Sequence, residues 1–216
     1  VDKKSYFSLL KRTPLLLGAI AIFLYVGAEV AIGSFAINYL VEINMAEISQ
    51  CPIGGPMWKA LGIIFNKPDL INADPKAMVA IFLCFYWGGA MVGRFIGAQL
   101  SRHLSPAKML MIVGLCNVVL ILIAINTGGL FSMLSLLLLG FFNSIMFPTI
   151  FALASEGIDE LKAQASGLLC TMIVGGGLVP ILFGFFTDLI GFSLAFLTLV
   201  VCYGYIAFFG FYKSSR

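Results

Sequence analysis

The chain has 216 residues, of which 61% are hydrophobic and only 11% are charged. A soluble domain is about 45–50% apolar and about 25% charged, so this composition excludes both a water-soluble globule and a disordered chain. A net charge of +3 without a compact basic patch argues against nucleic-acid binding, and five cysteines, four of them inside apolar runs, argue against a disulfide scaffold.

The composition leaves an integral membrane protein, whose helices each need about 20 mostly apolar residues to cross a hydrocarbon core of about 30 Å. Stretches of this kind lie at about 15–41, 77–100, 109–125, 130–154, 165–189 and 192–212. The alternating ten-residue segments that indicate a membrane β-barrel are absent. The sequence therefore predicts an all-α membrane protein, a bundle of six transmembrane helices.

Most breaks between these stretches are short, and only residues 42–76 form a long one, which we expect to be an extracytoplasmic loop. Of the thirteen Lys and Arg residues, ten fall on the face that carries both termini and three fall in the long loop. Because cations are favoured on the cytoplasmic side, both termini are predicted to be cytoplasmic. The chain begins with Val1 rather than Met, which suggests one half of something longer.

A short glycine pattern recurs at the ends of the second and fifth stretches. Gly97-x-x-x-Ser101 closes one, and Gly184-x-x-x-Asp188 closes the other. These stretches are equivalent if the bundle consists of two three-helix units, the second inverted in the membrane. Such a 3+3 inverted repeat is how one half of a major facilitator fold is built.

Glu29 is the most informative residue, because it lies near the middle of the first stretch. A central acid costs about 2.5–3.5 kcal/mol on the insertion scale and is by default a functional hypothesis. Tyr25 and Gly33 lie four residues to either side, on the same helical face. We expect this face to border a wet cavity. A buried acid that bonds a neighbouring helix purely for packing is the alternative.

Aromatic and amide side chains supply further candidates for a substrate-binding wall. The run Phe85-Tyr86-Trp87-Gly88-Gly89 combines aromatic faces with small residues, which suits a sugar ring but also suits a core cluster. Asn143 and Phe147 share one face of the fourth stretch. Asn143 could bond a hydroxylated substrate or hold two helices together. The candidate binding residues are Glu29, Tyr25, Tyr86, Trp87, Asn143 and Phe147.

Glycines and prolines mark places where the helices are expected to bend. The fifth stretch carries Gly175, Gly176, Gly177 and Pro180, and the fourth carries Pro148. We expect the fifth helix to be kinked or locally loosened there. The alternative is that Gly and Pro are simply more frequent in membrane helices than in soluble ones.

Arg94 and Arg102 lie near the cytoplasmic end of the second stretch. Arg94 can extend its side chain toward the membrane interface. A gating latch, in which Arg94 or Arg102 pairs with Glu156, is a further hypothesis. Catalytic, phosphate-binding and metal-ligating motifs are absent, and His103 is the only histidine, so neither an enzyme nor a cofactor or metal is predicted.

Four segments resemble bacterial fucose/glucose/galactose permeases, the sugar:proton symporters of the FHS type in the major facilitator superfamily. They match helices seven, eight, ten and eleven of those carriers and are Tyr25–Phe35, Phe85–Phe95, Phe147–Phe151 and Gly175–Pro180. The resemblance implies the carboxy-terminal half of an inner-membrane carrier that uses a hexose and a coupling proton or cation, and whose amino-terminal six-helix half is missing. Glu29 stands where a Gln is expected in fucose carriers, which points to the glucose/galactose branch.

The sequence leaves three functions open. The reading it favours is half of an alternating-access hexose carrier. The second is a non-transporting six-helix membrane module or assembly partner, for which the discriminator is whether six more helices are encoded upstream. The third, an intramembrane enzyme, would need a second catalytic polar group near Glu29, and none is evident.

Overall fold

The computed structural model describes residues 9, 11–42, 59–60, 62–64, 66, 75–158 and 161–215, with only the course of the backbone at 75–83. Within these residues the regular structure is helical, which confirms the prediction of an all-α bundle. The loop expected at 42–76 falls largely outside the described residues.

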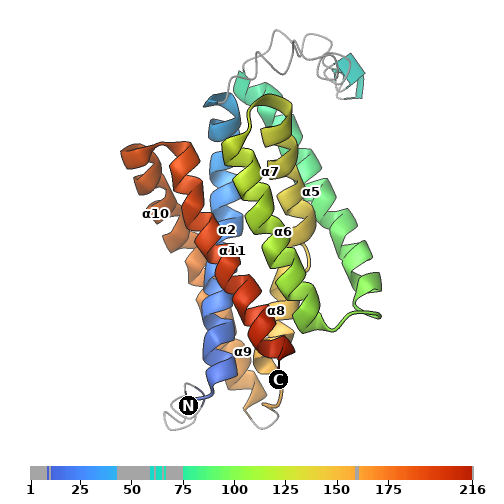
Figure 1. The fold of residues 1–216 in the computed structure, drawn as a ribbon, viewed down its shortest axis with the longest axis vertical. Helices are drawn as coiled ribbons and strands as arrows, with labels where there is room; N and C mark the ends of the chain where they lie inside the picture. Colours follow the sequence, from blue (N-terminus) through green and yellow to red (C-terminus); the bar gives the residue numbers. More distant parts are fainter. Residues whose placement is uncertain are drawn as a thin grey trace.

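The helices follow one another as long membrane-sized segments, two of which are interrupted (Figure 1). In chain order they are α2 (Thr13–Glu42), α5 (Pro75–Leu100), α6 (Pro106–Asn126), α7 (Gly129–Asn143), α8 (Met146–Ser155), α9 (Lys162–Thr171), the 3₁₀ turn η2 (Met172–Val174), α10 (Gly175–Ile190) and α11 (Phe192–Ser214). Consecutive α7 and α8 correspond to the fourth predicted span. The fifth span consists of α9, η2 and α10.

Five helical segments within the described residues are long and apolar enough to cross a membrane. They are Thr13–Glu42, Pro106–Asn126, Gly129–Ser155, Lys162–Ile190 and Phe192–Ser214. Helix α5 adds 26 residues, which at about 1.5 Å per residue reach about 39 Å and so exceed the hydrocarbon core. In Figure 1, α2 begins and α11 ends at the same end of the bundle.

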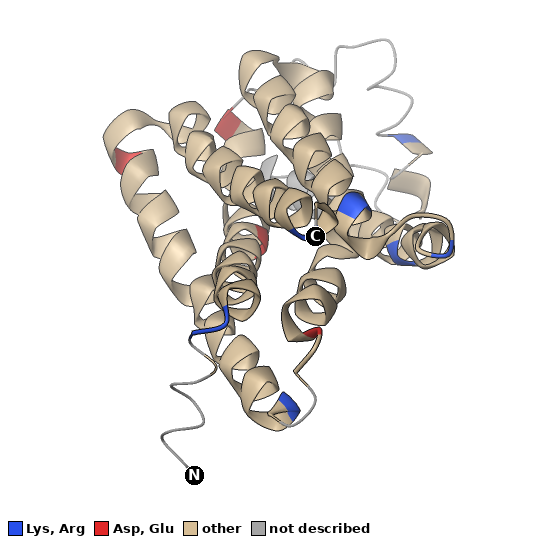
Figure 2. Cartoon of the chain, turned by 60° about the horizontal axis from the view of Figure 1, so that its bottom comes forward, with Lys and Arg blue, Asp and Glu red and all other residues tan. Residues whose placement is uncertain are grey.

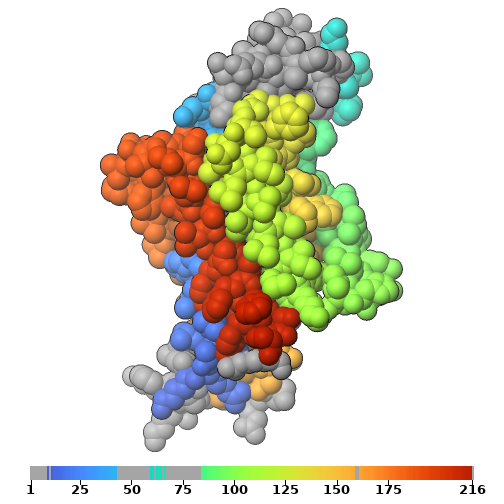
Figure 3. Space-filling model, in the orientation of Figure 1, coloured from blue at the N-terminus to red at the C-terminus, as the bar shows by residue number. Residues whose placement is uncertain are grey.

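Helix α2 lies at the centre of the bundle, where it contacts α5, α7, α8, α9, η2, α10 and α11. Helices α6 and α11 form another extensive contact and lie side by side on the face shown in Figure 3. Their backbones approach closely at Gly114, where a Cβ would meet Ala207, and at Gly210, where it would meet the backbone of Met111. Small residues of this kind let membrane helices pack tightly.

A capping serine and a turn glycine set two of the helix ends, and a tyrosine hydrogen bond joins α2 to α6. Ser105 caps α6 by accepting a hydrogen bond from the Lys108 amide. Gly191, with φ of 81°, makes the sharp turn from α10 into α11, a conformation that favours glycine. The buried Tyr39 hydroxyl lies 2.8 Å from the carbonyl of Ala124, to which it donates, so it ties α2 to the end of α6.

Candidate functional site

A hollow of about 680 Å³ opens along one side of the bundle and lies within the size range of ligand pockets, about 300–1,000 Å³. Side chains from α2, α5 and the junction between α7 and α8 form most of its wall. Its lining includes the predicted residues Tyr25, Glu29, Arg94 and Phe147. The remaining wall is largely apolar, so the few polar groups that reach the hollow define its chemistry.

Glu29 is half-buried at the wall of this hollow. Tyr25 lies one helical turn earlier on α2, and both residues line the hollow together with Arg94 of α5. Among the described residues that line the hollow, Glu29 is the sole acid and Arg94 the sole base. The hollow therefore presents one acidic and one basic group, on α2 and α5, in a largely apolar setting. Figure 2 shows how sparsely such charges are distributed along the helices.

The junction between α7 and α8 forms the part of the wall next to these charges. Helix α7 ends at Asn143 and α8 begins at Met146, with Pro148 three residues in. Arg94 Nε donates to the carbonyl of Ser144 at 3.3 Å, and the Tyr25 hydroxyl donates to the carbonyl of Asn143 at 3.0 Å. Two side chains of the hollow thus bond the main chain at the interruption of a membrane span.

Asn143 and Tyr86 lie behind this wall and are almost fully buried. Asn143 Oδ1 accepts from Asn117 Nδ2 at 2.7 Å, and Asn143 Nδ2 donates to the Tyr86 hydroxyl at 2.9 Å. These bonds join α5, α6 and α7. Of the two roles that the sequence left open for Asn143, a bond to substrate or a bond between helices, the structure shows the bond between helices. Asn117 was missed by sequence reasoning, although a lone Asn inside an apolar span signals an interhelical bond.

The two remaining aromatic candidates are placed differently. Phe147 reaches the hollow, where its ring lies 6.3 Å from that of Tyr25. Trp87 is 56% exposed and packs edge-on against Tyr86 at 5.4 Å, outside the lining of the hollow. The structure therefore brings Tyr25, Glu29 and Phe147 together at the hollow and places Tyr86, Trp87 and Asn143 beyond it.

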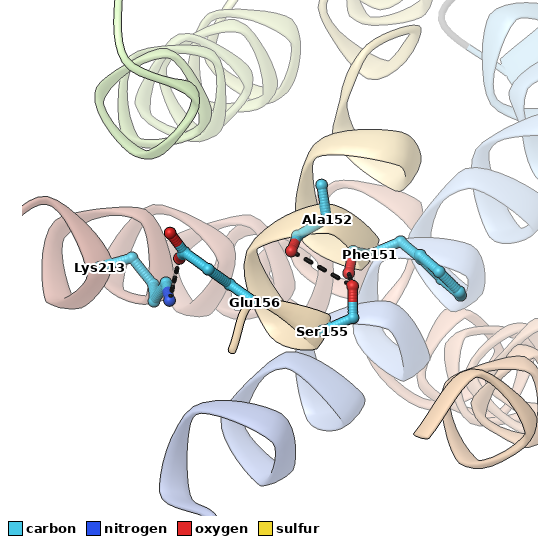
Figure 4. A network of polar contacts seen from close by, with 5 residues as sticks. All are labelled: Phe151, Ala152, Ser155, Glu156 and Lys213. Carbon is cyan, nitrogen blue, oxygen red and sulfur yellow. Dashed lines mark hydrogen bonds and ion pairs between the residues drawn. The ribbon is translucent and has the colours of Figure 1, made fainter. Parts of the chain in front are cut away.

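The latch hypothesized for Glu156 is not formed in this structure. Glu156 pairs instead with Lys213 of α11, at 2.6 Å (Figure 4). Arg94 is held in the hollow by its bond to Ser144, and Arg102 is exposed in the turn after α5. The same loop is also bonded by Arg12, whose Nη1 donates to the carbonyl of Gly157 at 2.8 Å.

The fifth span is interrupted just before Gly175, where η2 separates α9 from α10. Gly175 and Gly176 pack on α2: a Cβ at Gly175 would collide with the Phe23 carbonyl, and one at Gly176 would press on Val26. Gly177 faces open space, and α10 continues past Pro180 without a break. The interruption therefore precedes the proline and coincides with a close approach of two backbones.

Comparison with known proteins gives relatives along nearly the whole chain, although no family model matches it. It is 42% identical over 200 residues, 93% of its length, to a glucose/galactose transporter of Brucella abortus, and 39% identical over 207 residues to a putative glucose/galactose transporter of Helicobacter pylori. It is 30% identical over 200 residues to the L-fucose-proton symporter of Escherichia coli. The chain covers 42%, 44% and 39% of these proteins, and so spans less than half of their length.

A solved structure shares the fold of the whole chain. The crystal structure of the major facilitator transporter FucP, in the outward conformation, matches with a TM-score of 0.82 and 26% identity. The match covers 100% of this chain and 46% of that one. The helical arrangement of the described residues is therefore also found in part of a solved transporter.

Proposed function

Because the chain belongs to the fucose/glucose/galactose permease family of the major facilitator superfamily, we propose that it forms the carboxy-terminal half of a hexose transporter. Its relatives carry the names of transporters and not of enzymes. The observation that carries the proposal is the hollow that places Glu29 and Arg94 together within an apolar bundle. The rest of a longer protein, the amino-terminal six-helix half, would supply the facing wall.

The polar groups of the hollow suit a hydroxylated substrate. A carboxylate accepts and a guanidinium donates hydrogen bonds, and sugar hydroxyls do both. The rings of Tyr25 and Phe147 offer apolar faces beside these groups, which complements the mixed surface of a hexose. The substrate class we propose is a glucose- or galactose-like hexose, with fucose as the alternative sugar.

Transport would proceed by alternating access, with coupling to a proton or another cation. Substrate sites of such carriers lie between two bundles, next to interrupted helices, and the bundles rock around them. Interruptions at α7–α8 and at η2 border this hollow through Ser144, Ile145 and Ile173. Glu29 supports coupling because a carboxyl group can bind and release a proton beside the sugar. The excess of Lys and Arg on the terminal face supports an orientation with both ends cytoplasmic, and the bacterial relatives support an inner-membrane location.

The test is uptake of labelled D-glucose, D-galactose and L-fucose by the full-length carrier in proteoliposomes, with and without an imposed pH gradient. Glu29→Gln is expected to lower uptake about tenfold or more, because a lost charged hydrogen bond costs about 1.5–3 kcal/mol. Asp188→Asn is the matched control, since Asp188 is an exposed acid of α10 outside the hollow. Full uptake by Glu29→Gln would remove Glu29 from the site, and a purified carrier that moves none of the sugars would contradict the function.

A further inference from the structure

The interruption between α7 and α8 has a specific chemical cause. Pro148 has no amide hydrogen, so the carbonyl four residues earlier, that of Ser144, loses its normal helical donor. In an apolar membrane interior an unpaired carbonyl is costly, and another donor must replace the lost one. Other bonds at the junction are local: Ser144 Oγ donates to the Phe141 carbonyl and Thr149 Oγ1 to the Ile145 carbonyl.

The carbonyls of Asn143 and Ser144 are bonded from other helices instead. Arg94 on α5 donates to Ser144, and Tyr25 on α2 donates to Asn143. Both donors line the hollow together with Glu29, and Pro148 lines it too. The groups that hold the interruption are therefore the same groups that face the proposed sugar site.

We expect Glu29 to compete for these donors, because it lines the same hollow as Tyr25 and Arg94. The Tyr25 hydroxyl has one proton, which it gives to the Asn143 carbonyl, and Glu29 follows Tyr25 by one turn of α2. Hydrogen bonds to an ionised acceptor are about twice as strong as those between neutral groups. An ionised Glu29 would therefore draw Tyr25 and Arg94 toward itself, and a proton or a sugar hydroxyl bound at Glu29 would release them to the two carbonyls.

We propose that Tyr25 and Arg94 are positioning residues that couple the occupancy of the hollow at Glu29 to the bend between α7 and α8. The inference rests on the proposed function, because it assigns how the sugar site acts on a helix. The bend would change the direction of α8, whose far end carries the Glu156–Lys213 pair. Binding in the hollow would thus change the position of α8 at one end of the bundle through a single interrupted span.

A double-mutant cycle in the full-length carrier isolates the bond from Arg94 to Ser144. Pro148→Ala restores an amide hydrogen at residue 148, which can bond the Ser144 carbonyl without Arg94. Arg94→Met, which keeps the length and removes the donors, is expected to lower Tm and to reduce uptake about tenfold, since it removes a charged hydrogen bond. In the Pro148→Ala background the Tm loss is expected to shrink to less than half.

Pro180→Ala is the matched control, because it removes a proline from α10 and leaves the α7–α8 junction intact. In the Pro180→Ala background, Arg94→Met is expected to lower Tm by as much as it does in the unchanged carrier. Equal Tm losses in the Pro148→Ala, Pro180→Ala and unchanged backgrounds would overturn the assignment of Arg94 to the junction, even in a carrier that transports sugar normally.

A distance measurement separates coupling from a purely structural role. Spin labels at Leu138 in α7 and Ala152 in α8, both exposed, would report the bend by pulsed spin resonance in the full-length carrier with its native cysteines replaced. Adding the transported hexose is expected to shift the distance, and the shift is expected to vanish in Tyr25→Phe and in Glu29→Gln. A carrier that takes up sugar with an unchanged distance would refute the coupling and leave the proposed function standing.

Discussion

The two interrupted spans of this bundle are held in different ways. Between α7 and α8, polar side chains from α2 and α5 bond the main chain, and these side chains also line the hollow. Between α9 and α10, the 3₁₀ turn is followed by Gly175 and Gly176, which pack directly on the backbone and side chains of α2. One interruption is held by hydrogen bonds, and the other is held by close apolar packing.

This difference indicates which interruption can respond to a ligand. The donors that bond the main chain at α7–α8 would be drawn away by an ionised Glu29 and released when a proton or a sugar hydroxyl binds there. A glycine packed on a neighbouring backbone has no group that a sugar or proton can compete for. A proline alone does not distinguish the two cases, because α10 continues past Pro180 while the fourth span is interrupted beside Pro148.

Asn143→Ala is the largest expected disruption, and it acts on the hydrogen-bonded interruption. It leaves the buried Asn117 amide and Tyr86 hydroxyl without their bonds to Asn143, at about 1–3 kcal/mol for each group left unpaired. Thermal unfolding of the purified full-length carrier would measure the loss. An Asn117→Ala background should reduce the effect of Asn143→Ala, since one of the two bonds is then already absent. Additive losses would show that the amides do not act together.

Gly175→Ala tests the packed interruption and is expected to cost less. Its Cβ would meet the carbonyl of Phe23, so α2 and α10 must separate, and overpacking of this kind costs about 1–3 kcal/mol. The difference in Tm between Gly175→Ala and the unchanged carrier should be the same with and without added sugar. Gly177→Ala makes the same change in the same helix, where nothing lies near the new Cβ, and should leave Tm unchanged or slightly higher, because Ala favours a helix more than Gly does. Equal losses in both variants would show that close packing at Gly175 does not set the effect.

The fold was largely predictable from the sequence because the membrane leaves few choices. Each apolar stretch must satisfy its own backbone groups, so the stretches become helices. The interruptions were predictable only in part. Gly175 and Pro148 mark them, but where the chain leaves the helix depends on neighbours: the Phe23 backbone in one case and the donors Tyr25 and Arg94 in the other.

The site was predictable only where a residue is expensive in lipid. Glu29 stands out because an isolated carboxyl in a membrane span needs a reason, and the structure places it at the hollow. Tyr86 and Trp87 are adjacent in the sequence, yet one is buried behind the wall and the other is more than half exposed. Helix rotation decides this difference, and a run of apolar residues on every face of a helix does not encode the rotation.

Removal of the Glu156–Lys213 pair is expected to have the smallest effect on Tm, and it tests whether the end of α8 moves when the α7–α8 interruption bends. The Glu156 side chain is 66% exposed and that of Lys213 is 12% exposed. Ion pairs open to solvent contribute about 0–1 kcal/mol, so Lys213→Met, which keeps the buried stem and removes the charge, should barely lower Tm. The pair nevertheless joins the loop after α8 to α11 (Figure 4). If α8 changes direction during transport, Lys213→Met should alter the uptake rate more than it alters Tm, and the same change at the exposed Lys162 should alter neither. A Tm loss of several degrees with an unchanged rate would instead make the pair a structural tie.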